Sequence, residues 1–169
     1  MHAKDVLIET YGRIQEEVHA VVDGLSPDDL NARPDDHANS ISWLVWHLTR
    51  VQDDHIADAF GLKQVWVSDG WADRFALALP HTDTGYGHTP QKVGKVRVDS
   101  GDLLVGYYDA VHEQTLGALR GLRADDLDRV VDENWSPPVT LSVRLVSVAS
   151  DDLQHVGQAA YVRGLSAGR

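Results

Sequence analysis

An acidic residue and a histidine stand four positions apart near the end of the chain, Asp151 and His155. Residues with this spacing lie one above the other on the same face of an α-helix, so both side chains can reach one point beside it. A carboxylate and an imidazole on the packed side of a helix are costly unless they are paired or bind a metal ion. The pair is therefore a candidate half of a metal site.

The spacing by itself is weak support, because the chain contains 26 acidic residues among 169 and places many of them near histidines by chance. A metal site needs a further ligand, and His47 in the segment SISWLVWHLTRV is the candidate. Two ligands from one helix and one from another would leave open coordination positions, as catalytic metal sites do. The alternative is that both histidines are core residues that hydrogen-bond Asp151 without a metal.

The elements that must position these residues are four long helices. Apolar residues recur at helical spacing over approximately residues 4–24, 40–60, 100–121 and 140–164. Four helices of this length predict an all-α fold, a four-helix bundle, and bundles build their sites from inward side chains on facing helices. We expect Gly164 to end the last helix as a left-handed cap, and the chain of residues 1–169 to form a single domain.

The segment between the second and third helices, residues 62–100, loses this periodicity. It contains one expected short helix near residues 70–75 and the turn-rich stretch HTDTGYGHTP. A connection of this length in a compact domain is usually functional or disordered. Its aromatic residues favour packing over disorder, so we interpret it as a lid over the site.

Composition excludes several classes of function. A net charge of −11 leaves no basic face for nucleic acid, and no apolar run is long enough to span a membrane. The chain has no cysteine, which excludes disulfides, thiolate metal sites and cysteine nucleophiles. Any thiol used by this protein must therefore arrive with a cofactor. The first residues do not resemble a signal peptide, so we expect a cytoplasmic protein.

The WLVWHL segment, the long middle loop and the pattern Asp-x-x-x-His-x-Gly-Gln at 151–158 resemble the DinB-like superfamily, which includes bacillithiol- and mycothiol-dependent transferases. The resemblance implies a DinB/YfiT-like bundle with a divalent metal, most often zinc or nickel, on His47, Asp151 and His155. The family has histidine or glutamate where this chain has Asp151. Because aspartate is one methylene shorter than glutamate, the metal must lie closer to the last helix or bind Asp151 through water.

The same resemblance implies a function. The chain is similar to the bundle domain of mycothiol-dependent maleylpyruvate isomerase, without that enzyme's additional domain. We therefore expect a metal-dependent thiol S-transferase or isomerase that uses a low-molecular-weight thiol such as mycothiol on a small electrophile. The alternatives are a metal-dependent hydrolase that activates water at the same site, and a non-catalytic, stress-related metal-binding bundle. A homodimer is also expected.

Three further residues are predicted to contact the cofactor or the ligands. Gln158 lies one helical turn beyond His155 and can hydrogen-bond a ligand histidine or a bound group. His55 follows Asp54 near the end of the second helix and can support the site from outside the ligand set. His88 lies in the turn-rich loop and is expected to contact the substrate or cofactor.

Overall fold

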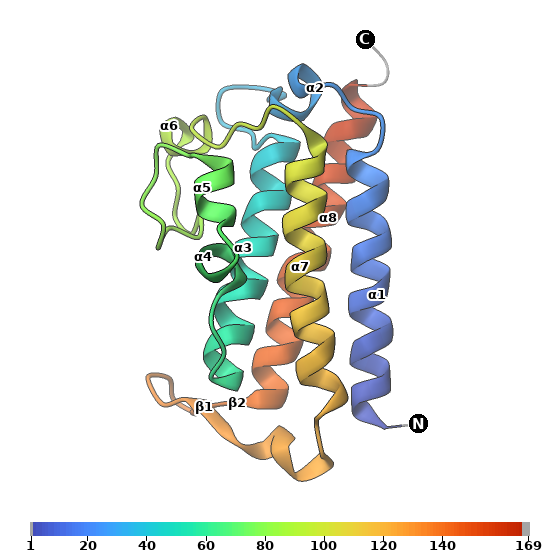
Figure 1. Cartoon of the computed structure of the whole chain (residues 1–169), viewed down its shortest axis with the longest axis vertical. Coiled ribbons are helices and arrows are strands. Elements are labelled where there is room, and N and C mark those ends of the chain that lie inside the picture. The colour runs from blue at the N-terminus through green and yellow to red at the C-terminus, as the bar shows by residue number, and fades with distance from the viewer. Residues whose placement is uncertain (1, 167–169) are drawn as a thin grey trace.

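Four helices of 20 or more residues dominate the structure, a computed structural model that describes residues 2–166. They are α1 (Ala3–Val22), α3 (Ile41–Phe60), α7 (Gly101–Arg120) and α8 (Leu141–Ser166). Figure 1 shows them side by side, with α1 and α8 running in one direction and α3 and α7 in the other. The predicted all-α bundle is confirmed. No helix between residues 2 and 166 combines the length and apolar character that a membrane span needs.

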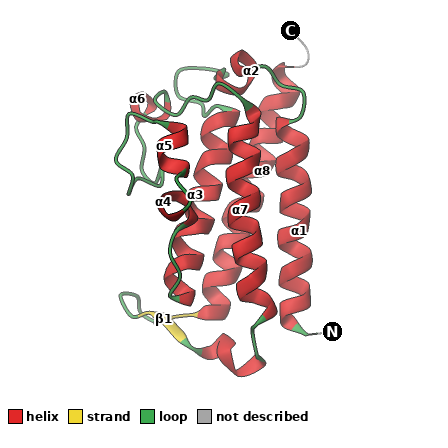
Figure 2. Cartoon of the chain, in the orientation of Figure 1, coloured by secondary structure: helices red, strands yellow, loops and turns green. Residues whose placement is uncertain are grey.

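Helix α3 is the most deeply buried of the four. It packs against both α7 and α8, while α1 covers the opposite side of that pair. Every residue from 41 to 50 is buried, because the segment after α3 returns along its remaining side (Figure 2). A polar side chain in this part of α3 is therefore shielded from water and needs a partner within the protein.

The returning segment contains three short helices, α4 (Val65–Ser68), α5 (Trp71–Phe75) and α6 (Pro90–Val93). The short helix expected near residues 70–75 is confirmed by α5. A cluster of aromatic rings anchors the segment to α7: Trp66 and Phe75 lie 5.0 Å and 5.9 Å from the ring of Tyr107. Burial of aromatic side chains on this scale holds the segment against the bundle.

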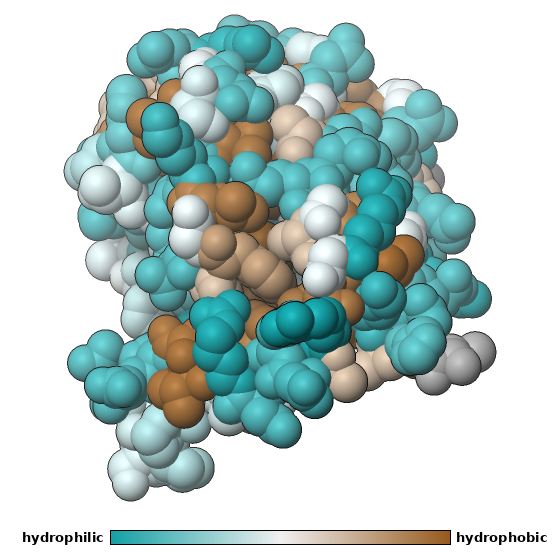
Figure 3. Space-filling model, turned by 60° about the horizontal axis from the view of Figure 1, so that its bottom comes forward, coloured by the Kyte–Doolittle hydropathy of each residue, from teal (hydrophilic) through white to brown (hydrophobic). Residues whose placement is uncertain are grey.

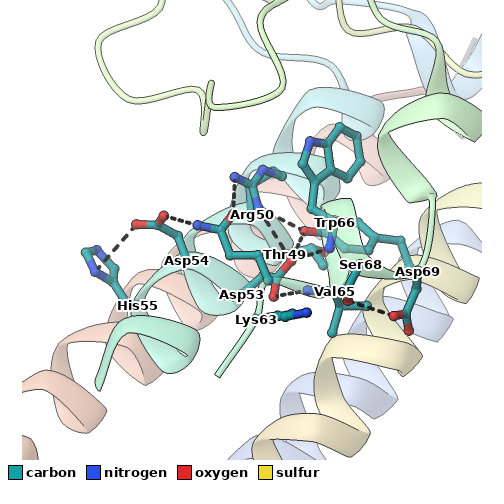
Figure 4. Close-up of polar contacts among 12 residues, drawn as sticks. Thr49, Arg50, Asp53, Asp54, His55, Lys63, Val65, Trp66, Ser68 and Asp69 are labelled. Atoms are coloured by element: carbon teal, nitrogen blue, oxygen red, sulfur yellow. Dashed lines mark hydrogen bonds and ion pairs between the residues drawn. The ribbon is translucent and has the colours of Figure 1, made fainter. Parts of the chain in front are cut away.

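A buried carboxylate ties the same segment to α3. Asp53 accepts hydrogen bonds from the backbone amides of Val65 (2.9 Å) and Trp66 (2.8 Å) and from the Tyr107 hydroxyl (2.8 Å). The guanidinium of Arg50, which is also fully buried, lies 3.5 Å from Asp53. Figure 4 shows Arg50 and Asp53 meeting Val65 and Trp66 at the start of α4. A buried ion pair persists only with such additional hydrogen bonds.

The remaining elements close the two ends of the bundle. Helix α2 (Pro27–Asn31) lies between α1 and α3. At the opposite end, the 3₁₀-helix η1 (Ala124–Asp128) leads into an antiparallel hairpin of β1 (Val130–Asp132) and β2 (Val139–Thr140). The hairpin leads directly into α8, whose first residue follows Thr140. Its strands are too short for a period of two to show in the sequence.

The expected end of the last helix at Gly164 is wrong, because α8 continues through this residue to Ser166. A glycine inside a helix costs only about 1 kcal/mol relative to alanine. The preceding residue, Arg163, donates hydrogen bonds to the backbone oxygens of Val21 (3.1 Å) and Asp23 (2.7 Å) at the end of α1. These contacts hold the last turns of α8 in place.

Candidate metal centre

The three predicted ligands lie together between α3 and α8. His47 from α3 and Asp151 and His155 from α8 each offer one ligand atom, and these atoms all lie within 4.8 Å of one another. On α8 the four-residue spacing acts as expected, because His155 Nε2 lies 3.5 Å from Asp151 Oδ1. His47 comes from the fully buried part of α3 and is 5% exposed. The arrangement therefore joins residues about a hundred positions apart in the chain.

Hydrogen bonds fix which ring atom each histidine offers. His47 Nδ1 lies 2.5 Å from the backbone oxygen of Thr84, and His155 Nδ1 lies 3.0 Å from Oε1 of Gln158. Both partners are oxygen acceptors, so each Nδ1 donates its hydrogen, and in the neutral ring Nε2 keeps the lone pair. Metal-binding histidines usually donate their other ring N–H in this way. The two imidazoles are thus prepared for ligation through Nε2.

The carboxylate of Asp151 is also suited to bind a cation. Its Oδ2 atom is buried and has no hydrogen-bond partner among residues 2–166. A buried carboxylate oxygen without a partner is unfavourable and is satisfied by a cation. Two neutral imidazole nitrogens and one carboxylate are a suitable donor set for zinc, nickel and related divalent ions. The residues present therefore fit a divalent metal.

The site favours an ionised aspartate before any metal arrives. Burial alone would raise the pKa of Asp151, but its hydrogen bond with His155 and the charge of that imidazole outweigh burial and lower it. Burial alone would lower the pKa of His155, and the same contact together with the bond to Gln158 raises it instead. For His47 burial dominates and lowers the pKa, although its bond to Thr84 opposes the shift. A cation bound at His155 Nε2 would take the place of the proton that this nitrogen carries in the charged form of the ring.

Asp152, the neighbour of Asp151 in the chain, lies on a different face of α8 and in a different environment. Asp152 points into the core, is fully buried, and has no hydrogen-bond partner for either oxygen in the described chain. Burial and the nearby carboxylate of Asp151 hold the pKa of Asp152 well above its usual range. The neutral form of Asp152 is therefore favoured, and the role of anionic ligand is left to Asp151.

Aromatic side chains cover one side of the three candidate ligands. The indole of Trp43 stacks on the His47 ring, with ring centres 4.5 Å apart and planes 19° apart. The rings of His47 and His155 meet edge to face at 4.8 Å. This packing keeps water from the covered side and limits rotation of the His47 ring.

The other side opens into a pocket of about 520 Å³ that runs along the groove between α3 and α8. His47 and Asp151 line its inner end, and Val51 and Val148 supply apolar walls. Trp135, in the loop of the hairpin, contributes to the outer end and is 66% exposed. Seen from the hairpin end of the bundle, the surface shows apolar residues gathered in a hollow with hydrophilic residues around it (Figure 3).

Of the further predicted residues, His55 lines this pocket. Its Nδ1 accepts a hydrogen bond from Arg144 (3.0 Å), whose other nitrogen binds Asp132 of the hairpin (2.9 Å). Burial lowers the pKa of His55, and the charge of Arg144 lowers it further. His55 therefore presents a neutral imidazole to the pocket, and its contact with a cofactor stays a prediction.

Gln158 contacts the candidate ligand His155, and His88 contacts Trp43. Gln158 accepts the hydrogen of His155, as described above. His88 has both ring nitrogens bonded within the protein, one to Trp43 (3.1 Å) and one to Asp83 (2.8 Å), and its side chain is 1% exposed. His88 is therefore engaged by Trp43 and Asp83 and does not line the pocket.

Four residues that contribute to the site were not predicted from the sequence: Thr84, Asp83, Trp43 and Arg144. Thr84 acts through its backbone oxygen, for which a side chain gives no signal. The glycines of HTDTGYGHTP indicated a turn, but the turn chemistry did not reveal that Gly85 lies against His47. A Cβ atom at this position would lie 2.6 Å from His47 Nδ1.

The fold and the site together define a class of protein, a helical bundle that gathers two histidines and a carboxylate between facing helices as ligands for a divalent cation. The sequence profile of the DinB superfamily matches residues 10–159. The chain therefore belongs to the DinB superfamily.

A solved structure is similar over the whole molecule. It is described as the crystal structure of the conserved protein of locus from Enterococcus faecalis, and its sequence is 34% identical. The alignment covers 100% of this chain and 99% of that chain, with a TM-score of 0.93. A search among curated proteins finds no match.

Proposed function

We propose that this protein is a metal-dependent thiol S-transferase or isomerase that acts with a low-molecular-weight thiol on a small electrophile. One observation carries the proposal: His47, Asp151 and His155 lie together, and two of them, His47 and Asp151, line a pocket of about 520 Å³. The chain contains no cysteine of its own. A thiol bound in the pocket would therefore supply the nucleophile.

The side chains have distinct parts in this chemistry. A divalent cation, when bound, lowers the pKa of a thiol so that the thiolate prevails at neutral pH. His47, Asp151 and His155 would hold that cation, and Trp43, which stacks on His47, would limit the access of water from its side. In a transfer reaction the thiolate sulfur bonds to carbon while the leaving group departs with the electron pair. In an isomerisation the thiol adds to the substrate and is eliminated again.

Zinc or nickel is the proposed metal, because two imidazoles and one carboxylate suit both ions. The family resemblance supports mycothiol or bacillithiol as the thiol. The apolar walls formed by Val51 and Val148 favour an electrophile with an apolar body. The electrophile itself is to be found by screening.

Two measurements test the proposal. Metal analysis and calorimetric titration should show one divalent ion per chain, and His47→Ala should abolish this binding. His81→Ala is the matched control, because His81 is an exposed histidine and its variant should bind normally. Mycothiol, bacillithiol and glutathione should then be titrated into the metal-loaded protein.

Each outcome has a distinct meaning. Saturable binding of a thiol that is lost in His47→Ala supports the proposal. A failure of all three thiols to bind the metal-loaded protein overturns it. Turnover of an ester or amide without any thiol would identify a hydrolase instead, and a chain that binds no metal would be a non-catalytic bundle.

A further inference from the structure

We propose that His88, together with Asp83, positions the metal ligand His47 through Thr84 and Trp43. The inference rests on the metal site of the proposed function. His88 is then a positioning residue that touches neither metal nor substrate. This positioning has two arms, one through the loop backbone and one through the indole of Trp43.

The first arm runs through the carboxylate of Asp83. Its Oδ1 accepts hydrogen bonds from the backbone amide of Gly85 (3.0 Å) and from Nε2 of His88 (2.8 Å). These two bonds close the loop around Thr84, which lies between Asp83 and Gly85 in the chain. The backbone oxygen of Thr84 is thereby directed at His47 Nδ1.

The backbone of this loop is also fixed from the bundle side. The backbone oxygen of Asp83 accepts a hydrogen bond from Nε of the buried Arg50 (3.3 Å). Gly85 has a φ of 92°, a conformation that glycine adopts with little cost. The loop therefore passes against the His47 ring in an arrangement held by Arg50 of α3 and by His88 of the loop itself.

The second arm runs through Trp43. Its indole N–H donates to His88 Nδ1 (3.1 Å), and its ring stacks on His47. An indole nitrogen can only donate, so His88 Nδ1 must carry the lone pair and Nε2 the hydrogen. That hydrogen points to Asp83, as the first arm requires. A single tautomer of His88 satisfies both arms.

The consequence concerns the tautomer of His47. Donation from Nδ1 to Thr84 leaves the Nε2 lone pair for the cation. If the loop is released, His47 can place its hydrogen on either nitrogen and rotate, so a cation meets fewer correctly prepared rings. Loss of an outer partner of this kind typically lowers metal affinity about 10–100-fold.

The test compares two substitutions at one position. Leucine in His88→Leu can bond neither Trp43 nor Asp83. Glutamine in His88→Gln can accept from Trp43 and donate to Asp83, which repeats the pattern of the native imidazole. His81→Ala serves as the control for a histidine of the same loop that is exposed to solvent.

Cobalt(II) is the probe for the metal arm, because its visible absorption reports both affinity and ligand geometry. We expect His88→Leu to bind cobalt about 10–100-fold more weakly and with an altered spectrum. His88→Gln and His81→Ala should remain within about threefold of the wild type. Circular dichroism of all variants separates this effect from a failure to fold.

Nitrogen-15 NMR of the His47 ring in the metal-free protein gives an independent readout. The wild type and His88→Gln should show a single tautomer with the hydrogen on Nδ1, and His88→Leu should show a mixture. If the wild type binds no metal, the proposed function fails, and the NMR result still decides the positioning role. An unchanged His47 tautomer in a folded His88→Leu variant overturns the inference, as does failure of His88→Gln to restore it.

Discussion

The contact between Gly85 and His47 allows a sharp test with a matched control. In Gly85→Ala the new Cβ would lie 2.6 Å from His47 Nδ1 and 3.0 Å from a ring carbon of Trp46. Ordinary contact begins near 3.4 Å, so the loop or the ring must move by about 0.8 Å. In Gly87→Ala the backbone is similarly left-handed, with φ of 68°, but no atom lies within 4 Å of the new Cβ.

The two variants therefore share one cost and differ in another. A left-handed alanine costs both of them about 1–2 kcal/mol. Gly85→Ala adds an overpacking cost of about 1–3 kcal/mol, and the required shift stretches the hydrogen bond between Thr84 and His47. We expect Gly85→Ala to be less stable than Gly87→Ala by that second amount, and to bind metal about 10–100-fold more weakly.

Urea unfolding of the metal-free variants measures the stability difference, and calorimetric titration with zinc measures the affinity. Gly87→Ala should keep its zinc affinity within about threefold of the wild type, because its loop stays in place. Equal stability and equal zinc affinity in Gly85→Ala and Gly87→Ala would refute the close approach of the loop to His47.

Three other outcomes follow from the same structure. Zinc at a free concentration of 100 times its Kd should stabilise the protein by about 2.7 kcal/mol. This stabilisation should raise Tm by about 5–11 °C for a chain of this size, and addition of EDTA should reverse the shift. Asp53→Ala leaves buried donors unpaired and should cost about 3–5 kcal/mol in urea unfolding. Asp54→Ala, at a site with a 39% exposed side chain, should cost less than about 1 kcal/mol. Equal costs would contradict the buried hydrogen bonds of Asp53 with the start of α4, which Figure 4 shows. Burial alone would raise the pKa of Asp83, but hydrogen bonds from the Gly85 amide and from His88 outweigh burial and lower the pKa. The ionised Asp83 therefore stabilises the fold above its unfolded-state pKa of 3.8. This stabilisation is lost as the pH falls through the lower pKa of the folded state. The metal-free wild type should therefore lose stability below about pH 4 more steeply than Asp83→Asn, and parallel pH curves would show that Asp83 makes no such contribution.

The long helices and the candidate ligands were accessible from the sequence because their signals are local. Apolar residues at steps of three and four predict each helix without knowledge of its neighbours. The four-residue spacing of Asp151 and His155 specifies a shared face of one helix in the same way. Because the chain has no cysteine, any thiol must come from outside it. His47 was predicted as the partner ligand from its place on a facing helix, and the family resemblance implied the same residue.

Tertiary structure decided which atoms surround those ligands. The backbone oxygen of Thr84 reaches His47 only because Arg50, Asp83 and His88 fold the loop back onto α3. No sequence periodicity or motif predicts these contacts, because a hydrogen bond to a backbone oxygen requires no particular side chain at that position. Packing also separated Asp151 from Asp152, because a rotation of about 100° between neighbouring helical residues places one beside the pocket and the other in the core.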